Sequence, residues 1–432
     1  MSINKSPNHK IHSPKIQKAR NVLTVASLIL GLSIPSMSFS SDWASAWYAS
    51  PQPRFLPSFI EANPVPKSIS NQTIRQIVRL NLDGSKIRVA ISNEYGIQPL
   101  TVGVASVASL DADGLIIPKS NQELTFGGDT EVRIPQGSKV ISDPIKRDVS
   151  AFDKLAISMY FPKEVMLDTF HNLGRETTYL SGIGNFVNKA SFKAKASFPS
   201  WVLLSDVLVD APEDAKTVVL FGDSITDGYN SSLGMNRRYP DFLAERFHAE
   251  GYSNVSVVNA GISGAQLMNA AAGESALARL DSQVLTQPNV KIMVLLMGIN
   301  DLGFAESLDP WRSVPSSQDL IKMYQMIIDR AHLQGIRIFG ATLTPFKHAF
   351  KGINNLENYY SDEKNKAREE VNEWTRTSGA FDGIIDFDKI IRDPARVDYM
   401  LDKYNSGDNL HPNDLGYKAM ADAIDLKLLL IK

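Results

Sequence analysis

Residues 218–228 read Val218-Val219-Leu220-Phe221-Gly222-Asp223-Ser224-Ile225-Thr226-Asp227-Gly228, and the expected architecture follows from them. A run of β-branched and apolar residues ends at Gly222, and a helical pattern begins at about Tyr239 after a polar loop that contains glycine. This pattern predicts a buried parallel strand whose carboxyl end delivers Ser224 to the edge where open α/β sheets bind ligands. A serine there is a nucleophile only if a base takes its proton and donors face the developing oxyanion. Otherwise it is a helix cap.

The sequence around this stretch alternates between two patterns. Strand-like runs occupy 216–221, 255–259, 291–297, 337–341 and 383–386, and helical stretches lie near 239–250, 275–285, 317–334, 361–377 and 414–430. Such alternation is typical of a doubly wound parallel sheet flanked by helices. We expect this α/β domain to span residues 215–432.

Upstream of residue 210 the pattern is different. Short alternating runs recur between residues 73 and 181, separated by clusters of Gly, Pro, Asp and Asn, and no long helix is indicated. They predict an all-β sandwich or jelly-roll domain over residues 42–210. Within it, Asp83-Gly84 predicts a hairpin turn between strands at 73–82 and 86–92, and the aromatic entry from Trp43 to Tyr48 is expected to be an irregular arm.

Composition excludes several classes of function. The 432 residues carry a formal net charge of −2, so there is no basic surface for nucleic acid. The chain has no cysteine, which excludes disulfides, thiolate metal sites and a cysteine nucleophile. No His-x-x-x-His pattern or hard-ion loop is present, so we expect neither a metal nor a cofactor.

The N-terminus is typical of an exported protein. Five basic residues precede the apolar segment 22–34, which is followed by Pro35 and by Ser38-Phe39-Ser40. This pattern predicts a signal peptide over residues 1–40 and release of the mature chain to the periplasm or the medium. An uncleaved anchor is the alternative.

A candidate base lies near the C-terminus. His411 follows Asp408-Asn409-Leu410 in the loop before the last expected helix, at the same sheet edge as Ser224. Asp408 could hold the ring through Nδ1 and leave Nε2 for the serine. The alternative to this catalytic role is that His411 is an ordinary loop histidine and Asp408 forms a turn. His171, in the β region, is a weaker candidate for a side chain that projects into the site.

Candidate oxyanion donors follow two neighbouring strands. The chain reads Ala260-Gly261-Ile262-Ser263-Gly264 after the strand at 255–259, and Gly298-Ile299-Asn300-Asp301 after the strand at 291–297. Glycines let the backbone N–H groups approach a ligand, and the amide of Asn300 can donate. Taken singly, ordinary turn geometry explains both loops.

Taken together, these segments resemble the blocks of the SGNH, or GDSL, hydrolases across residues 216–430. The resemblance implies a flavodoxin-like catalytic domain in which Ser224 is the nucleophile and His411 is the base held by Asp408. It also implies an oxyanion hole made by the N–H groups of Ser224 and Gly264 and by the side chain of Asn300. With the N-terminal β region, the chain resembles the secreted arylesterase and acylhydrolase branch of that family.

The function expected from the sequence is therefore that of an exported serine esterase acting through an acyl-enzyme. Its substrates would be small-molecule or polysaccharide esters: acetyl or short acyl groups on carbohydrates, or small aryl or alkyl esters. Aromatic loops at 302–317 and 342–360 should lie over the serine, but they assign no single substrate-binding residue. The alternatives are a long-chain lipase and a carbohydrate-binding protein in which the hydrolase domain is incidental. No stable membrane insertion is expected after signal cleavage.

Overall fold

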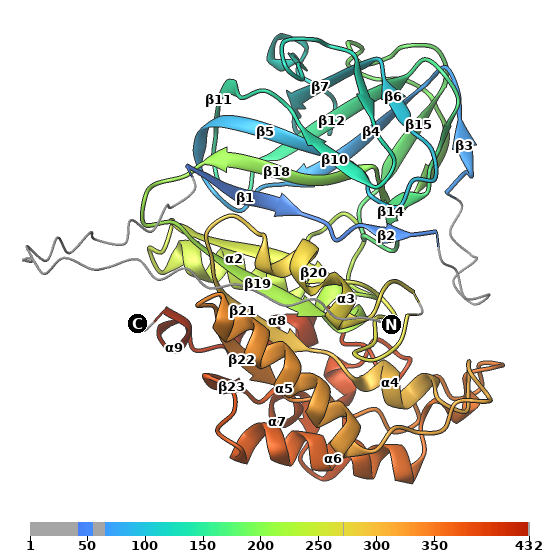
Figure 1. Ribbon diagram of the computed structural model, residues 1–432, viewed down its shortest axis with the longest axis vertical. Coiled ribbons are helices and arrows are strands. Elements are labelled where there is room, and N and C mark those ends of the chain that lie inside the picture. Colours follow the sequence, from blue (N-terminus) through green and yellow to red (C-terminus); the bar gives the residue numbers. More distant parts are fainter. Residues whose placement is uncertain (1–41, 55–64, 271, 431–432) are drawn as a thin grey trace, which may run out of the picture. The chain divides into compact units, whose positions relative to one another are not determined.

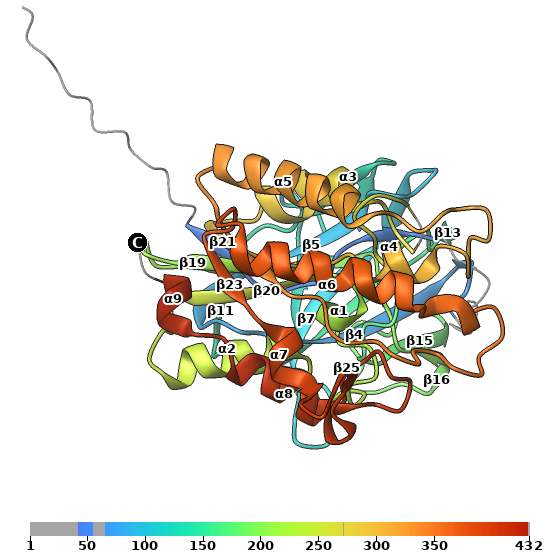
Figure 2. The ribbon, with the colours of Figure 1, turned by 90° about the horizontal axis from the view of Figure 1, so that it is seen from below.

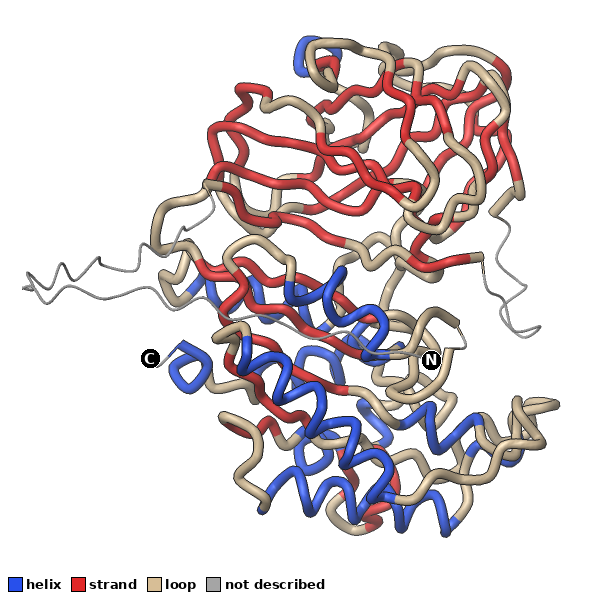
Figure 3. The backbone as a smooth tube through the Cα atoms, in the orientation of Figure 1, coloured by secondary structure: helices blue, strands red, loops and turns tan. Residues whose placement is uncertain are grey.

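A computed structural model of the chain describes residues 42–54, 65–270 and 272–430. The expected signal peptide at residues 1–40 lies outside them. These described residues belong to one compact unit, which contains two large hydrophobic cores. We call the residues 42–210 the β module and the residues 216–430 the α/β module. Figure 3 shows that strands and loops make up nearly all of the β module, whereas helices surround the strands of the α/β module.

The α/β module is built on a five-stranded sheet in the order β20-β19-β21-β22-β23, in which all neighbouring strands are parallel. Its strands are β19 (Lys216–Gly222), β20 (Val255–Gly261), β21 (Val290–Leu296), β22 (Arg337–Ala341) and β23 (Gly383–Ile385). Six of the seven residues of β19 are buried, because helices cover both faces of the sheet. Gly222 pairs with Gly261 on one side and Leu296 on the other, so three strands end together at one edge.

Helices lie on both sides of this sheet. Figure 2 shows α3 (Ala276–Leu280) and α5 (Ser317–Leu333) on one side, and α2 (Tyr239–Ala249), α7 (Phe387–Ile391) and α8 (Asp414–Asp422) on the other. The remaining elements are α1 (Ser224–Asp227), α4 (Ile299–Phe304), α6 (Asp362–Thr377), α9 (Leu426–Leu430), a π-helical turn η2 (Asp281–Leu285), 3-10 turns η3 (Glu357–Tyr359) and η4 (Asp402–Tyr404), and the hairpin of β24 (Arg392–Asp393) and β25 (Arg396–Met400).

One helix prediction is wrong. The single helix expected over 414–430 is divided into α8 and α9. The side chain of Asp425 accepts hydrogen bonds from the N–H groups of Lys427 (2.9 Å) and Leu428 (3.2 Å). Asp425 thus satisfies the first N–H groups of a new helix, and this capping separates the two elements.

The β module has two antiparallel sheets that pack around one core. The first sheet contains β1 (Trp43–Tyr48), β18 (Leu204–Asp210), β5 (Gly84–Asn93), β10 (Ser138–Ile141) and β11 (Ile145–Val149). The second contains β16 (Ala194–Phe198), β15 (Thr178–Ile183), β4 (Gln72–Arg79), β12 (Lys154–Phe161), β7 (Val104–Ser109) and β8 (Gln122–Leu124). A small three-stranded sheet contains β2 (Gln52–Pro53), β14 (Thr169–His171) and β17 (Trp201–Val202). Two strand pairs complete the module: β3 (Ser68–Ile69) with β13 (Val165–Met166), and β6 (Leu100–Val102) with β9 (Val132–Ile134). The 3-10 turn η1 is Pro118–Ser120.

Two expectations for the β module are wrong. β4 and β5 do not form a hairpin, because each belongs to a different sheet. Leu80 and Leu82, between the two strands, are buried, because the chain passes there from one sheet to the other through the core. The N–H of Leu80 donates to the carbonyl of Asp153, and the N–H of Asn81 donates to the carbonyl of Ala46. The aromatic entry is not an irregular arm either: it is β1, paired with β18 along its length.

The two modules share a polar and apolar junction. β1, β2 and β14 form the part of the β module next to the α/β module (Figure 1). The Asn81 side chain donates to the carbonyl of Val257 in β20 (2.6 Å), and Arg79 pairs with Glu245 of α2 (2.9 Å). Tyr48 belongs to the hydrophobic core of the α/β module. Within the described ranges, no helix has the length and apolar content needed to cross a membrane.

Candidate active site

Ser224 lies where β19 gives way to α1. Asp223 caps this short helix by accepting a hydrogen bond from the N–H of Ile225 (3.0 Å). Gly222 permits the tight turn, because a Cβ there would lie 2.0 Å from Thr226 Oγ1 and 2.7 Å from the carbonyl oxygen of Leu296. Ser224 is 5% exposed, so its hydroxyl is nearly enclosed at the carboxyl edge of the sheet.

His411 and Asp408 meet Ser224 at that edge. His411 Nε2 is 2.7 Å from Ser224 Oγ, and Nδ1 is 2.6 Å from Asp408 Oδ2. The loop that carries them lies between η4 and α8, far from Ser224 in the sequence. The ring of His411 packs against Tyr229 at a centroid distance of 4.5 Å. The structure therefore brings together the three residues that the sequence proposed as nucleophile, base and orienting carboxylate.

Asp408 is held in its ionised form by its neighbours. Burial by itself raises its pKa, but the charge of His411, the hydrogen bond from the ring and the N–H groups of His411 and Leu410 outweigh burial and lower the pKa to about 2. Asn230 donates a further hydrogen bond to Oδ2 (3.0 Å). Asp408 is thus an anion that can only accept hydrogen bonds, so Nδ1 of His411, which faces it, carries a hydrogen.

The proposed oxyanion donors belong to Ser224, Gly264 and Asn300, which all line one cavity. Within the described residues, the N–H groups of Ser224 and Gly264 donate to no other group. Asn300, the second residue of α4, lines the same cavity as both. One hydrogen of its amide goes to the carbonyl of Ala265 (3.0 Å), which leaves the second available to a ligand.

Two residues that the sequence did not assign hold this arrangement. The hydroxyl of Tyr359, in η3, donates to Asn300 Oδ1 (2.8 Å), so the amide nitrogen of Asn300 turns away from Tyr359. Arg279 of α3, fully buried, donates to the carbonyls of Ala260 and Gly222, each at 2.8 Å. These carbonyls lie at the ends of β20 and β19. Tyr359 belongs to the aromatic loop 342–360 that was expected over the serine, and Arg279 lies outside all of the motifs; no pattern in the sequence predicts the contacts that the two residues make.

A cavity of about 290 Å³ opens beside Ser224. Phe304, Phe350, Ile353, Leu356 and Leu410 form its apolar wall in the α/β module. The β module adds two further apolar residues, Leu173 and Pro199. The lining is thus apolar except for the groups next to the hydroxyl, an arrangement typical of a binding site for a small organic molecule.

The aromatic loops divide between this cavity and the protein interior. Phe304 and Phe350 line the cavity, as expected for residues that lie over the serine. Phe346 and Tyr359 are fully buried in a small hydrophobic core beneath it, whereas Trp311 is 96% exposed. His171 does not line the cavity. It is buried at the junction of the modules, where its Nε2 lies 2.9 Å from Asp227.

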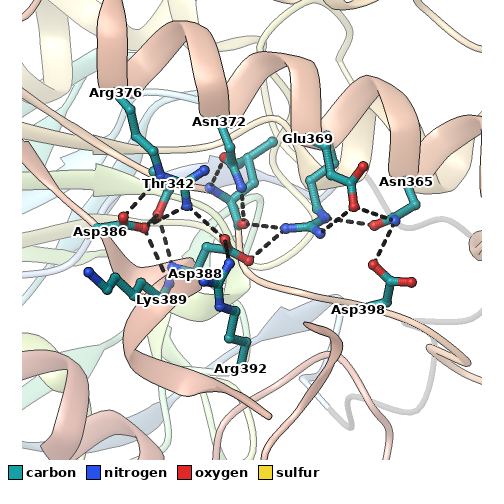
Figure 4. Close-up of polar contacts among 12 residues, drawn as sticks. Thr342, Asn365, Glu369, Asn372, Arg376, Asp386, Asp388, Lys389, Arg392 and Asp398 are labelled. Atoms are coloured by element: carbon teal, nitrogen blue, oxygen red, sulfur yellow. Dashed lines mark hydrogen bonds and ion pairs between the residues drawn. The ribbon is translucent and has the colours of Figure 1, made fainter. Parts of the chain in front are cut away.

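A second polar cluster lies away from Ser224, between α6 and α7 (Figure 4). Arg368 and Arg376 bind the carboxylate of Asp388, and Arg376 also binds Asp386. Because these charges satisfy one another, the cluster is a structural ion-pair network that joins α6 to α7. In the described part of the chain, no group of three or more His, Asp or Glu side chains is arranged to hold a metal ion.

Comparison with known proteins bears on the α/β module. The model of the GDSL-like Lipase/Acylhydrolase family matches residues 220–419. A search of the curated proteins gives no match.

Similar solved structures cover about half of this chain. An acetyl xylan esterase is 20% identical and covers 48% of this chain and 96% of its own, with a TM-score of 0.36. The aryl esterase of M. smegmatis is 14% identical and covers 50% of this chain and 100% of its own, with a TM-score of 0.39. A GDSL-like lipase from Bacteroides thetaiotaomicron is 17% identical, with coverages of 49% and 87% and a TM-score of 0.36. Residues 220–419 therefore form a GDSL-like lipase/acylhydrolase domain, which makes the protein a carboxylic ester hydrolase.

Proposed function

We propose that the protein is a serine esterase that hydrolyses short acyl esters through an acyl-enzyme on Ser224. The observation that carries this proposal is the 2.7 Å approach of Ser224 Oγ to His411 Nε2, with Asp408 bound to the other ring nitrogen. A serine hydroxyl is a weak nucleophile unless an adjacent base removes its proton during attack. Here the base is within hydrogen-bond reach before any substrate binds.

In the acylation step, Ser224 Oγ attacks the ester carbonyl while its proton passes to His411 Nε2. The carbonyl π electrons move to oxygen, and a tetrahedral oxyanion forms. His411 then returns the proton to the leaving alcohol, and the carbonyl forms again as an acyl-enzyme. A water molecule then attacks the acyl carbon while His411 takes its proton; the bond from the acyl carbon to Ser224 Oγ breaks, and His411 returns the proton to Ser224 as the acid leaves. Asp408 stabilises the imidazolium that exists during each step.

The oxyanion is stabilised by the N–H groups of Ser224 and Gly264 and by the free amide hydrogen of Asn300. These donors are fixed before the reaction, so they need no rearrangement when charge develops on the carbonyl oxygen. Loss of one such donor typically costs about 10²–10³ in kcat.

The size and lining of the cavity limit the substrate. A volume of about 290 Å³ is at the small end of ligand pockets, which span roughly 300–1,000 Å³. An apolar wall favours an acyl chain or an aryl ring over a charged or hydroxyl-rich group. The cavity therefore supports acetyl, short acyl and small aryl esters, on a carbohydrate or a simple alcohol, over the esters of a long-chain lipase.

We also propose that the chain is exported by means of residues 1–40, which have the composition of a signal peptide. The strand order β20-β19-β21-β22-β23 supports a flavodoxin-like assignment for the α/β module. The two antiparallel sheets around one core support a β-sandwich assignment for the β module. Cell fractionation and N-terminal sequencing of the mature chain test the export.

The catalytic proposal is tested with p-nitrophenyl esters of increasing acyl length. We expect kcat/KM to be greatest for acetate to butyrate and to fall for longer chains. Ser224→Ala and His411→Ala should each lower kcat by several orders of magnitude. A serine-reactive organophosphonate should label the wild-type protein and not Ser224→Ala. Full activity of Ser224→Ala would exclude this mechanism.

A further inference from the structure

Buried polar side chains of the β module hydrogen-bond to residues that contact the loop of Gly264. His171 and Gln52, both in the small sheet of β2, β14 and β17, hydrogen-bond to Asp227 and to the carbonyl of Ala272 in the α/β module. Gly264 has φ +84°, in the region that favours glycine. A glycine backbone has the greatest conformational freedom, so the direction of its N–H depends on what holds its neighbours.

His171 is fully engaged at the junction. Its Nδ1 is 2.9 Å from the carbonyl oxygen of Ser50, which can only accept, so Nδ1 carries a hydrogen. Its Nε2 is 2.9 Å from Asp227 Oδ1. The two side chains are only 4% and 3% exposed. Since neither ring nitrogen faces the cavity, His171 cannot act on a substrate directly.

Asp227 joins His171 to the loop after β20 through hydrogen bonds. Its second oxygen, Oδ2, accepts hydrogen bonds from both the N–H (3.1 Å) and the hydroxyl (2.6 Å) of Ser263. Ser263 immediately precedes Gly264, and two bonds to one carboxylate oxygen fix its backbone and its side chain together. The peptide unit that joins Ser263 to Gly264, and carries the Gly264 N–H, therefore follows the position of Asp227.

Gln52 makes a second link to Gly264, by way of Ala272. Its amide nitrogen donates to the carbonyl of Ala272, and its Oε1 accepts from the N–H of Asn172, the residue after His171. Ala272 in turn packs on Gly264, where a Cβ would lie 2.8 Å from that of Ala272. The β module thus hydrogen-bonds directly to the loop through Gln52 and Ala272, and indirectly through His171 and Asp227.

We propose that His171 is a positioning residue for ester hydrolysis, which through Asp227 and Ser263 holds the Gly264 N–H toward the carbonyl oxygen of the bound ester. This inference rests on the proposed function, because it assigns Gly264 to the oxyanion hole. It gives the β module a part in catalysis: without the module, the Ser263–Gly264 loop loses its anchor and one donor of the hole is no longer fixed in place.

The test compares variants by kcat and KM, with active sites counted by organophosphonate titration. His171→Ala and Asp227→Ala should lower kcat about tenfold, less than the full loss of one oxyanion donor, because the Gly264 N–H remains but is misplaced. KM should change by less than about twofold, since the donor acts mainly in the transition state. A role in folding alone would lower the thermal midpoint and leave kcat per active site unchanged.

Asp227→Asn is the conservative variant. Its oxygen can accept both bonds from Ser263, and its NH₂ can donate to Nε2 of a neutral His171, so all of these hydrogen bonds persist. We expect it to keep kcat within about threefold of the wild type while Asp227→Ala does not. If His171→Ala does not fold, Ser263→Ala decides the matter, because it removes only a hydroxyl and one of the bonds to Asp227.

The matched control is Arg79→Met, which breaks another contact between the modules, the 2.9 Å ion pair with Glu245. It should lower stability without lowering kcat. The inference is overturned if folded His171→Ala or Ser263→Ala keeps the wild-type kcat, or if Arg79→Met lowers kcat as much. Those results would leave the proposed esterase mechanism intact, whereas full activity of Ser224→Ala removes the mechanism itself.

Discussion

Replacement of Asn300 by alanine tests how the oxyanion hole is built. In the structure this amide donates one hydrogen to the carbonyl of Ala265 (3.0 Å), accepts from the hydroxyl of Tyr359 (2.8 Å) and lines the cavity beside Ser224. Asn300→Ala removes all three functions at once. We therefore expect two separate effects, one on the transition state and one on the free energy of unfolding.

The two magnitudes differ. Loss of one preorganised donor raises the barrier by about 2.7–4 kcal/mol, or about 10²–10³ in kcat. The carbonyl of Ala265 and the hydroxyl of Tyr359 each lose a partner, at about 1–3 kcal/mol apiece. Water that enters from the adjacent cavity can hydrogen-bond to both groups, so we take the lower end of that range for each, about 2 kcal/mol in total. A domain that is stable by about 5–15 kcal/mol stays folded after such a loss.

The assay is steady-state hydrolysis of p-nitrophenyl acetate, with thermal unfolding followed in parallel by circular dichroism. Tyr359→Phe is the matched variant, because it keeps the amide of Asn300 and removes only the group that orients it. We expect a fall in kcat of about tenfold or less for Tyr359→Phe, between the wild type and Asn300→Ala. If folded Asn300→Ala retains kcat within about threefold of the wild type, Asn300 is not an oxyanion donor.

Three further substitutions test the surrounding structure. Arg279→Met should lower the free energy of unfolding by about 2–4 kcal/mol, measured in urea, because the carbonyls of Ala260 and Gly222 lose a buried donor; an unchanged midpoint would contradict this role. Gly264→Ala should lower both kcat and the thermal midpoint, since φ +84° and a 2.8 Å approach to Ala272 Cβ disfavour a side chain; wild-type kinetics would show that the loop tolerates movement. Arg376→Met should destabilise the protein by about 1–3 kcal/mol at pH 7. Burial raises the pKa of Asp386, but hydrogen bonds from Arg376 and Thr342 outweigh burial and lower the pKa. The stabilisation of the folded state by the ion pair is therefore fully present above the unfolded pKa of about 3.9, and it is lost as the pH falls through the folded pKa. The difference from the wild type should therefore narrow below about pH 4, and a constant difference in acid would argue against the ion pair.

Local sequence was sufficient to predict much of the α/β module. The strand expected at 337–341 is β22, and the helix expected at 317–334 is α5 to within one residue. The family expected from the four motifs is the one whose model matches residues 220–419. These predictions rest on short-range signals, namely apolar runs, helical periodicity and glycine-containing turns, which depend on neighbours in the chain.

The same signals failed where the outcome depended on distant partners. An alternating pattern around Asp83-Gly84 is equally compatible with a hairpin and with two strands in different sheets, and burial of Leu80 and Leu82 in the core decided for the second. The helix expected at 414–430 was interrupted because the Asp425 side chain capped a new helix.

Strand and turn chemistry is local, so the order of residues was enough to predict that Ser224, Gly264 and Asn300 follow neighbouring parallel strands. It did not determine the 2.7 Å contact of Ser224 with His411, nor the hold of Tyr359 on Asn300. These contacts, like the link from His171 to Asp227, join side chains tens to hundreds of residues apart. They arise when the chain folds, because a hydrogen bond depends on distance and direction in space and leaves no periodic pattern in the sequence.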